Sequence, residues 1–331
     1  MEFRTIVDIP TPDFTITNSS VMVMLGSCFV ENIGNMFTNN KFHCVVNPFG
    51  VLYNPHSIFN ALDLLLKSNC DLFTEHLFYY HNTWGSWMHS TQFSSPEKND
   101  CLKKIQEAYT CASRDLMTAN VLFITFGTNR YYRLKENGMV VANCHKFPSH
   151  LFSEEQIEAK EIAERAKITL SHLFEINNQI KVVFTVSPYR YKKYGLHGSQ
   201  LSKAQLLLAV DEICRLFPAK TYYFPAYEIV NDELRDYRFY ADDMLHPSTS
   251  AVQYIWERFA NMFLSDNAKN MVSDWAPIRN QLNHHFMSDD RSGQQAFLEN
   301  LILSIEDFSK RYPSVNVDDE LILIKNKLNT R

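Results

Sequence analysis

Five short apolar runs occur in the first two thirds of the chain, and each predicts a buried strand. The runs span residues 21–25, 43–46, 121–126, 181–186 and 221–224. Apolar runs of this length, without regular polar alternation, are typical of strands that are covered on both faces, as in a parallel sheet. We therefore expect these five segments to form one central sheet.

Helical patterns separate most of these strands. Apolar residues recur at helical spacing in 29–37, 55–67 and 202–217. The residues Ser153-Glu-Glu-Gln156 have the spacing of a capping box and predict the start of another helix, which runs to about Ile176. This alternation predicts an α/β protein in which helices wrap a parallel sheet, and such proteins bind ligands at the carboxyl ends of their strands.

Two regions do not fit this alternation. Residues 72–92 are rich in aromatic and β-prone side chains, which predicts an extra hairpin, packed either near the sheet edge or over the cleft. Amphipathic helical patterns follow near 274–287, 292–310 and 317–328. We expect residues 1–265 to form the α/β domain and residues 266–331 to form a C-terminal helical extension.

The composition argues against several classes of protein. The 331 residues are 45% hydrophobic, which is enough for a substantial core, and a net charge of -5 without a basic block argues against a nucleic-acid partner. The N-terminus lacks the pattern of a signal peptide, and no window reaches ~18 apolar residues, so we expect a cytoplasmic protein without a membrane partner. Seven cysteines without CxxC spacing favour free thiols over disulfides or a structural zinc site. Because no dinucleotide or phosphate loop occurs, no cofactor is expected.

The first predicted strand ends in a short turn that carries a hydroxyl and a thiol. The residues are Leu25-Gly26-Ser27-Cys28, directly before a predicted helix. A serine at such a turn can act as a nucleophile, because the helix N-terminus offers backbone N–H groups to an oxyanion. A purely structural role, in which Ser27 caps the helix, explains the same residue.

A candidate base lies near the end of the α/β region. Asp243 precedes His246 by three residues, and a carboxylate in this position can hold the Nδ1–H of the imidazole. The free Nε2 can then take a proton from a hydroxyl or a thiol. A surface turn is the alternative explanation for this spacing.

Three further segments carry polar groups after predicted strands. Gly127-Thr128-Asn129 follows the third strand, and its Asn129 amide can donate to an oxyanion. Gly50, after the second strand, can present a backbone N–H to the same atom, although both segments also fit ordinary turns. Asn143 and His145 follow a short predicted strand, 139–142, and we expect them to line the cleft. They make a poor metal site, because no second pair of ligands accompanies them.

Together these signals follow one order along the chain: serine, glycine, Gly-x-Asn, then Asp-x-x-His. Residues 20–265 resemble the SGNH hydrolase superfamily in this respect, and Leu25-Gly26-Ser27-Cys28-Phe29-Val30 is similar to the motif that gives the GSCFA family its name. Other segments that resemble this family are Asn47–Pro55, Asn143–Lys146, Ser187-Pro188, Ser202-Lys203, Tyr222–Glu228 and Asp236–Tyr240.

The resemblance implies a flavodoxin-like three-layer α/β/α fold and an esterase mechanism. It implies Ser27 as nucleophile, His246 as general base and Asp243 as the residue that orients the imidazole. The oxyanion hole would comprise the backbone N–H of Ser27, that of Gly50 and the side chain of Asn129.

The identity of the nucleophile has an alternative. An ungapped match to the Gly-Asp-Ser motif of most SGNH hydrolases puts Cys28, the third residue from Gly26, at the nucleophile position. A thiolate paired with His246 is chemically competent. We favour Ser27 because the residue after it would then start the helix, and because a cysteine followed by Phe29 would more naturally pack inward.

The sequence thus predicts a serine esterase that acts on a small acyl ester, such as an O-acetyl group on a carbohydrate-like substrate. An acyltransferase that uses the same acyl-enzyme is one alternative, because sequence does not reveal whether water or an alcohol accepts the acyl group. A non-catalytic module that binds a carbohydrate or another ligand on the same fold is the other.

Overall fold

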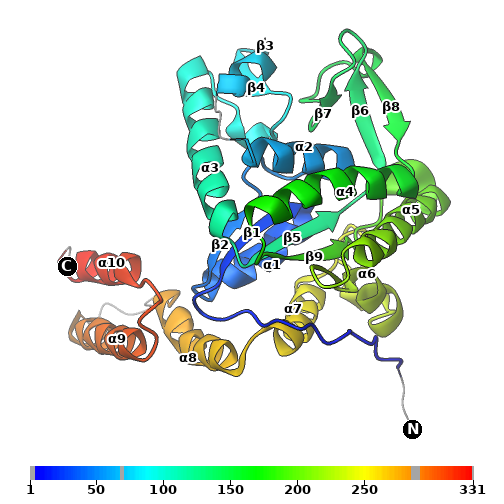
Figure 1. The fold of residues 1–331 in the computed structure, drawn as a ribbon. Helices are drawn as coiled ribbons and strands as arrows, with labels where there is room; N and C mark the ends of the chain where they lie inside the picture. Colours follow the sequence, from blue (N-terminus) through cyan, green and yellow to red (C-terminus); the bar gives the residue numbers. More distant parts are fainter. Residues whose placement is uncertain (1–3, 68–70, 285–290, 330–331) are drawn as a thin grey trace.

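A computed structural model describes residues 4–67, 71–284 and 291–329, and a five-stranded parallel sheet lies at its centre (Figure 1). The strand order is β10-β9-β5-β1-β2, with every neighbouring pair parallel. The strands are β1 (Val21–Gly26), β2 (His43–Val46), β5 (Val121–Phe126), β9 (Lys181–Val186) and β10 (Thr221–Tyr223). All five predicted strands are therefore confirmed, and their order is that of flavodoxin-like sheets.

Helices cover both faces of the sheet, because each strand sends alternate side chains to opposite sides. Val23 and Leu25 of β1 point into one apolar cluster, whereas Met22 and Met24 point into the other. The first cluster is closed by α2 (Pro55–Leu65), α3 (Lys98–Thr118), α4 (Ala159–Ile176) and α5 (Gly195–Leu216). The second is closed by α1 (Cys28–Asn39) and α7 (Thr249–Phe263). The predicted three-layer α/β/α fold is confirmed.

The predicted start of the helix at Ser153 is wrong. Residues Phe152–Gln156 form β8, which pairs antiparallel with β6 (Arg130–Leu134), and β6 also pairs with β7 (Val140–Val141). The side chain of Glu155 accepts hydrogen bonds from Tyr131 and Arg133 of β6, so cross-strand partners override the local capping signal. Helix α4 begins at Ala159 instead, and Glu161 supplies the capping-box carboxylate to the backbone N–H of Glu158.

The aromatic region forms the predicted hairpin. Strands β3 (Leu77–Tyr80) and β4 (Thr83–Ser86) pair antiparallel beside the end of α3. Shorter helical elements are η1 (Asp71–His76), η2 (Thr91–Phe93), η3 (Ser149–Leu151), η4 (Lys192–Tyr194), α6 (Ala226–Glu228), η5 (Ile229–Glu233) and η6 (Tyr237–Phe239). No helix among the described residues is both long and apolar enough to cross a bilayer.

The C-terminal region consists of α8 (Asp266–Leu282), α9 (Arg291–Arg311) and α10 (Asp318–Asn329). The three predicted helices are present, although α8 begins earlier than predicted and the predicted end at 287 lies outside the described residues. The indole of Trp275 is buried in the apolar cluster that α1 lines, and its Nε1–H donates to the carbonyl of Asn39 at 2.9 Å. These helices therefore share a core with the sheet.

We expect Trp275→Ala to destabilise the whole protein, because it removes a fully buried side chain and leaves a cavity under α1. The loss should be about 3–5 kcal/mol in the free energy of unfolding, measured by urea denaturation. Leu303→Ala on α9 is the control, since Leu303 is exposed and its truncation should change the stability by no more than about 0.5 kcal/mol. Unfolding of the C-terminal helices alone, with the sheet unchanged, would contradict the shared core.

Candidate active site

The predicted nucleophile lies where the strand order reverses. Strand β1 is flanked by β2 and β5, and the turns that follow β1 and β5 leave the same carboxyl edge of the sheet. The backbone N–H of Ser27 reaches the carbonyl of Thr125 on β5 at 3.3 Å. Open α/β sheets bind ligands in the crevice at this point.

Ser27 caps helix α1. Its Oγ accepts a hydrogen bond from the backbone N–H of Phe29 at 3.4 Å, and the residue is only 1% exposed. The turn after β5 packs closely against it: a Cβ added at Gly127 would lie 3.4 Å from Cβ of Ser27 and 2.6 Å from the hydroxyl of Tyr191. The Ser27 side chain thus fills a tight space between two turns.

Cys28 is the first residue of α1 and is partly exposed. Burial raises the pKa of its thiol, and the nearby carboxylate of Glu31 raises this pKa further, whereas the backbone N–H groups of Cys28 and Phe29 lower it. The N–H groups of a first helical turn have no acceptor within the helix. The thiol therefore stays protonated near neutral pH, in a place where an anion would meet helix N–H groups.

Asp243 and His246 form the pair that their spacing suggested. Nδ1 of His246 donates to Oδ2 of Asp243 at 2.6 Å, and Oδ1 of Asp243 accepts the backbone N–H groups of Leu245 and His246 at 2.8 and 2.9 Å. The backbone N–H of His246 lowers the pKa of Asp243 most, followed by the imidazole, to about 2. The carboxylate is thus ionised at any pH at which the protein is expected to work, and the imidazole is held in one orientation.

The loop after β9 connects this pair to the end of β1. The ring of Tyr189 lies 4.2 Å from the imidazole of His246, and the backbone N–H of Arg190 donates to the carbonyl of Leu245 at 3.2 Å. Tyr191 packs edge-on against Tyr189 at 4.8 Å. Since the hydroxyl of Tyr191 also reaches the turn at Gly127, two tyrosines span the interval between the base and Ser27.

The pKa values agree with this placement. Burial raises the pKa of Tyr189 most, and the negative charges of Asp243 and Cys28 each raise it further. One phenol therefore lies within electrostatic range of both groups. Sequence reasoning missed these tyrosines, although Ser187-Pro188 at the end of a predicted strand marked the loop that carries them.

The three predicted oxyanion donors all have acceptors within the protein. Besides the bond from Ser27 to Thr125, the backbone N–H of Gly50 donates to the carbonyl of Asn47 at 2.7 Å. The side-chain amide of Asn129 donates to the carbonyl of Ile157 at 3.1 Å. These groups would bind an oxyanion only by exchanging those bonds.

Asn47 offers a donor that the sequence analysis did not single out. Its Oδ1 accepts the backbone N–H of Gly26 at 2.9 Å, which fixes the side chain beside the end of β1. Its Nδ2 is buried and has no hydrogen-bond partner among the described residues. Burial raises the pKa of Glu31, one turn along α1 from Cys28, and the nearby Asn47 side chain lowers this pKa in part, so the amide lies near the start of that helix.

Asn143 and His145 lie against the aromatic hairpin. Asn143 accepts the backbone N–H of His145 at 2.7 Å, and Nε2 of His145 lies 2.9 Å from the carbonyl of Ser86. The His145 ring packs on Phe78, and burial lowers its pKa. These contacts hold the β6–β8 sheet to the hairpin, and the expectation that the two residues line the cleft stays a prediction.

Lys203 is a further residue that sequence reasoning missed. It is 2% exposed, and its Nζ donates to the carbonyls of Gly127 and Ser187 at 2.6 Å each. A signal existed, because Lys203 occupies the apolar face of α5 in helical register with Leu206 and Val210. A lysine at such a position is rarely buried without a specific role.

A cavity of about 240 Å³ adjoins the Asp243–His246 pair. Tyr240, on its wall, forms an isolated bridge with Pro247, and the Arg190 guanidinium lies over the Tyr240 ring at 5.2 Å. The lining residues are Arg190, Gln200, Val230, Asn231, Arg235, Asp236, Tyr237 and Tyr240. The cavity thus lies next to the loop that carries the pair, although neither Asp243 nor His246 lines it.

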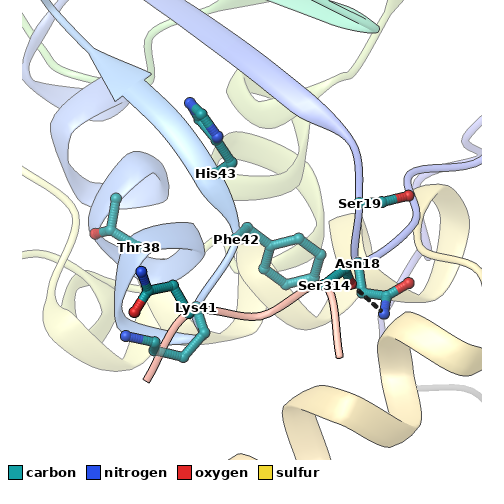
Figure 2. A pocket seen from close by; sticks show the side chains of 8 residues that line it. Asn18, Ser19, Thr38, Lys41, Phe42, His43 and Ser314 are labelled. Carbon is teal, nitrogen blue, oxygen red and sulfur yellow. Dashed lines mark hydrogen bonds between the residues drawn. The ribbon is translucent and has the colours of Figure 1, made fainter. Parts of the chain in front are cut away.

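Figure 2 shows a second cavity, of about 360 Å³, at the opposite end of the strands, where His43 begins β2. It is lined by Asn18, Ser19, Thr38, Lys41, Phe42, His43, Ser314 and Asn316. Lys41 pairs with Glu320 at 2.9 Å, and Nε2 of His43 lies 2.6 Å from Asp115. Because Lys41 and His43 already have charged partners, we interpret this cavity as part of the packing interface between the C-terminal region and the sheet, and not as a ligand site.

The described residues contain no disulfide and no cluster of metal ligands. The described cysteines, which exclude Cys70, are all free, as predicted. Within 4–67, 71–284 and 291–329, no group of three His, Cys, Asp or Glu side chains gathers as metal ligands would.

The structure thus defines an α/β protein with a hydrogen-bonded Asp243–His246 pair and a strand-to-helix turn at the carboxyl end of β1. A family model described as the GSCFA family matches residues 21–259, so the chain belongs to the GSCFA family. A second model, described as the C-terminal domain of GSCFA domain proteins, matches residues 275–330 and covers most of α8 to α10. No curated protein is similar enough to match the chain.

The raised pKa of Cys28 predicts how this thiol reacts with an alkylating agent. Because only the thiolate reacts, the alkylation rate at Cys28 should keep rising between about pH 7 and pH 9. Iodoacetamide labelling at several pH values, with the modified peptide quantified by mass spectrometry, measures this. A rate that reaches its plateau below about pH 8 would show a thiolate at neutral pH and contradict the burial argument.

Proposed function

We propose that this protein hydrolyses a small acyl ester, with His246 as general base, Asp243 as the residue that orients it, and Cys28 as nucleophile. The hydrogen-bonded Asp243–His246 pair carries the proposal, together with Tyr189, which packs on the imidazole and whose pKa responds to both Asp243 and Cys28. The order of the motifs along the chain also supports the proposal, since it resembles the order of motifs in SGNH hydrolases.

The choice of Cys28 in place of Ser27 depends on how the two side chains are held. The hydroxyl of Ser27 already serves as the cap of α1 and is buried. Helix α1 begins at Cys28, directly after Ser27, but the cysteine is only partly buried, which differs from the expectation that it would pack inward. Its side chain is partly exposed, beside the helix N–H groups.

The chemistry then follows from the position of each group. His246 takes the thiol proton at Nε2, and the sulfur attacks the carbonyl carbon of the ester. As the tetrahedral intermediate collapses, the bond to the alcohol oxygen breaks and His246 returns its proton to that oxygen. Water, activated by the same imidazole, hydrolyses the thioester and releases the acid.

An oxyanion formed at this carbonyl needs donors that are free before the reaction. The Nδ2 of Asn47 meets this condition, because it is buried and makes no hydrogen bond among the described residues. We therefore propose this donor ahead of Gly50 and Asn129, whose hydrogen bonds are already made.

The cavity near the Asp243–His246 loop supports a polar, carbohydrate-like alcohol as the other part of the substrate. Tyr237 and Tyr240 give flat surfaces on which a sugar ring can stack, and Arg190 adds hydrogen-bond donors. The acyl group is small in this proposal, as in an O-acetyl ester.

A covalent adduct tests the nucleophile. After incubation with p-nitrophenyl acetate and an acid quench, we expect an acetyl group on Cys28 that neutral hydroxylamine removes, as it removes thioesters but not ordinary oxygen esters. Cys28→Ala should abolish turnover, and Ser27→Ala should retain it. His246→Ala should reduce kcat by roughly 10²- to 10⁴-fold. His197→Ala, at an exposed position of α5, should have no effect.

Two other results would change the proposal. A hydroxylamine-resistant adduct on Ser27 would return the role of nucleophile to the serine. A folded protein that forms no adduct and releases no p-nitrophenol would contradict an esterase and favour the ligand-binding module.

The proposed oxyanion donor has a separate test. Asn47→Gly tolerates the left-handed backbone at this position (φ 46°) and removes the amide. We expect kcat to fall by roughly 10²- to 10³-fold with little change in KM. Asn129→Ala should leave kcat within about threefold of the wild-type value, because the bond to Ile157 that it removes is structural. The reverse pattern would restore Asn129 as the donor.

A further inference from the structure

A lysine is buried beneath the candidate active site. Lys203 lies on α5, and its Nζ donates to two carbonyls that end neighbouring strands: Gly127 after β5 and Ser187 after β9. Those two turns carry the residues that pack against Ser27 and His246, respectively. One amine thus holds both sides of the site.

The surroundings of Lys203 lack a neutralising group. No carboxylate pairs with it among the described residues, and the ring of Tyr191 lies 5.2 Å from Nζ. An ammonium has three hydrogens to donate, and two carbonyls accept from it. A buried charge is normally paired with an opposite charge, because transfer out of water is costly. The site therefore retains an uncompensated positive charge whenever Lys203 is protonated.

We propose that Lys203 is a positioning residue of the candidate active site, which fixes the turns after β5 and β9 and supplies a positive charge that favours an anion at Cys28. This proposal rests on the proposed function only because that function defines where the site lies. Its effect on the thiol is present whether or not the protein turns over an ester.

The electrostatics give this proposal a distinctive pH dependence. Burial lowers the pKa of Lys203 to about 7, and a negative charge on Cys28 raises it. By reciprocity, the ammonium lowers the pKa of the thiol, although burial and Glu31 raise that pKa overall. The charge is present below about pH 7 and is lost above it, so its help to the thiolate should fade as the pH rises.

Other ionisable groups face the same space, and each is left unchanged in the variants, so that its effect on Cys28 is the same in the wild type and in the variant. Glu31 on α1 acts on Cys28, as do Tyr53, Tyr189 and Tyr191 from the neighbouring loops. His246 contacts Tyr189. The phenols stay neutral over the range tested, because burial raises the pKa of all three.

The experiment measures the reaction of Cys28 with methyl methanethiosulfonate from pH 6 to pH 9, in the full chain, with the modified peptide quantified by mass spectrometry. Lys203→Met should slow the reaction about tenfold at pH 6, the effect of removing one neighbouring opposite charge. The difference should shrink to less than about twofold at pH 9, where the wild-type lysine is neutral.

Ser202→Ala is the matched control. Ser202 is the buried neighbour of Lys203 on α5, and its hydroxyl bonds Thr128 and the backbone N–H of Asn129, so the variant loosens the turn after β5 but keeps the charge. We expect any change in its rate to be the same at every pH.

Two outcomes would overturn the proposal: a Lys203→Met effect that does not depend on pH, or an equal pH-dependent effect in Ser202→Ala. If circular dichroism shows that Lys203→Met does not fold, Lys203→Gln answers the same question, since its amide can still donate to a strand-end carbonyl but carries no charge. The same rate profile as the wild type in the folded Gln variant would likewise exclude a role for the charge.

Discussion

The close approach of two turns at the carboxyl edge of the sheet determines the geometry of the candidate site. A Cβ at Gly26 would lie 2.3 Å from the carbonyl oxygen of Thr125, and Gly26 itself has a φ of 147°, which side chains rarely adopt. A Cβ at Gly127 would lie 2.6 Å from the hydroxyl of Tyr191 and 3.4 Å from Cβ of Ser27. Because the two glycines lack side chains, the turns after β1 and β5 can come together next to Tyr191 of the loop after β9.

Polar groups buried behind these turns fix their positions. Lys203 accounts for two strand-end carbonyls, Asn129 for the carbonyl of Ile157, and Asn47 for the backbone N–H of Gly26. Each is a buried polar side chain whose hydrogen bonds replace those lost to water. Two of these groups can still donate a hydrogen bond: the Lys203 ammonium, which has two acceptors for three hydrogens, and Nδ2 of Asn47. An anion bound at the site would be stabilised by these groups.

The far side of the sheet is stabilised by the C-terminal helices. Trp275 closes the apolar cluster beneath α1, and Lys41 pairs with Glu320 of α10. The helix that begins at the candidate nucleophile is thus held at its other end by the C-terminal region, which gives that region a structural link to the site. The boundary near residue 265 between a domain and an extension stays a prediction.

The five strands, the hairpin and the Asp243–His246 hydrogen bond could be predicted from local patterns, because apolar period, turn chemistry and a spacing of three residues act over short distances, and the three-layer fold could be predicted from the family resemblance. The local pattern failed at Ser153, where pairing of β8 with β6 outweighs a capping signal. The folded structure was needed to show that the donors of Gly50 and Asn129 already have acceptors, and that Tyr189, on the loop after β9, packs on His246. Hydrogen bonding and packing of this kind depend on segments far apart along the chain, which no local pattern records.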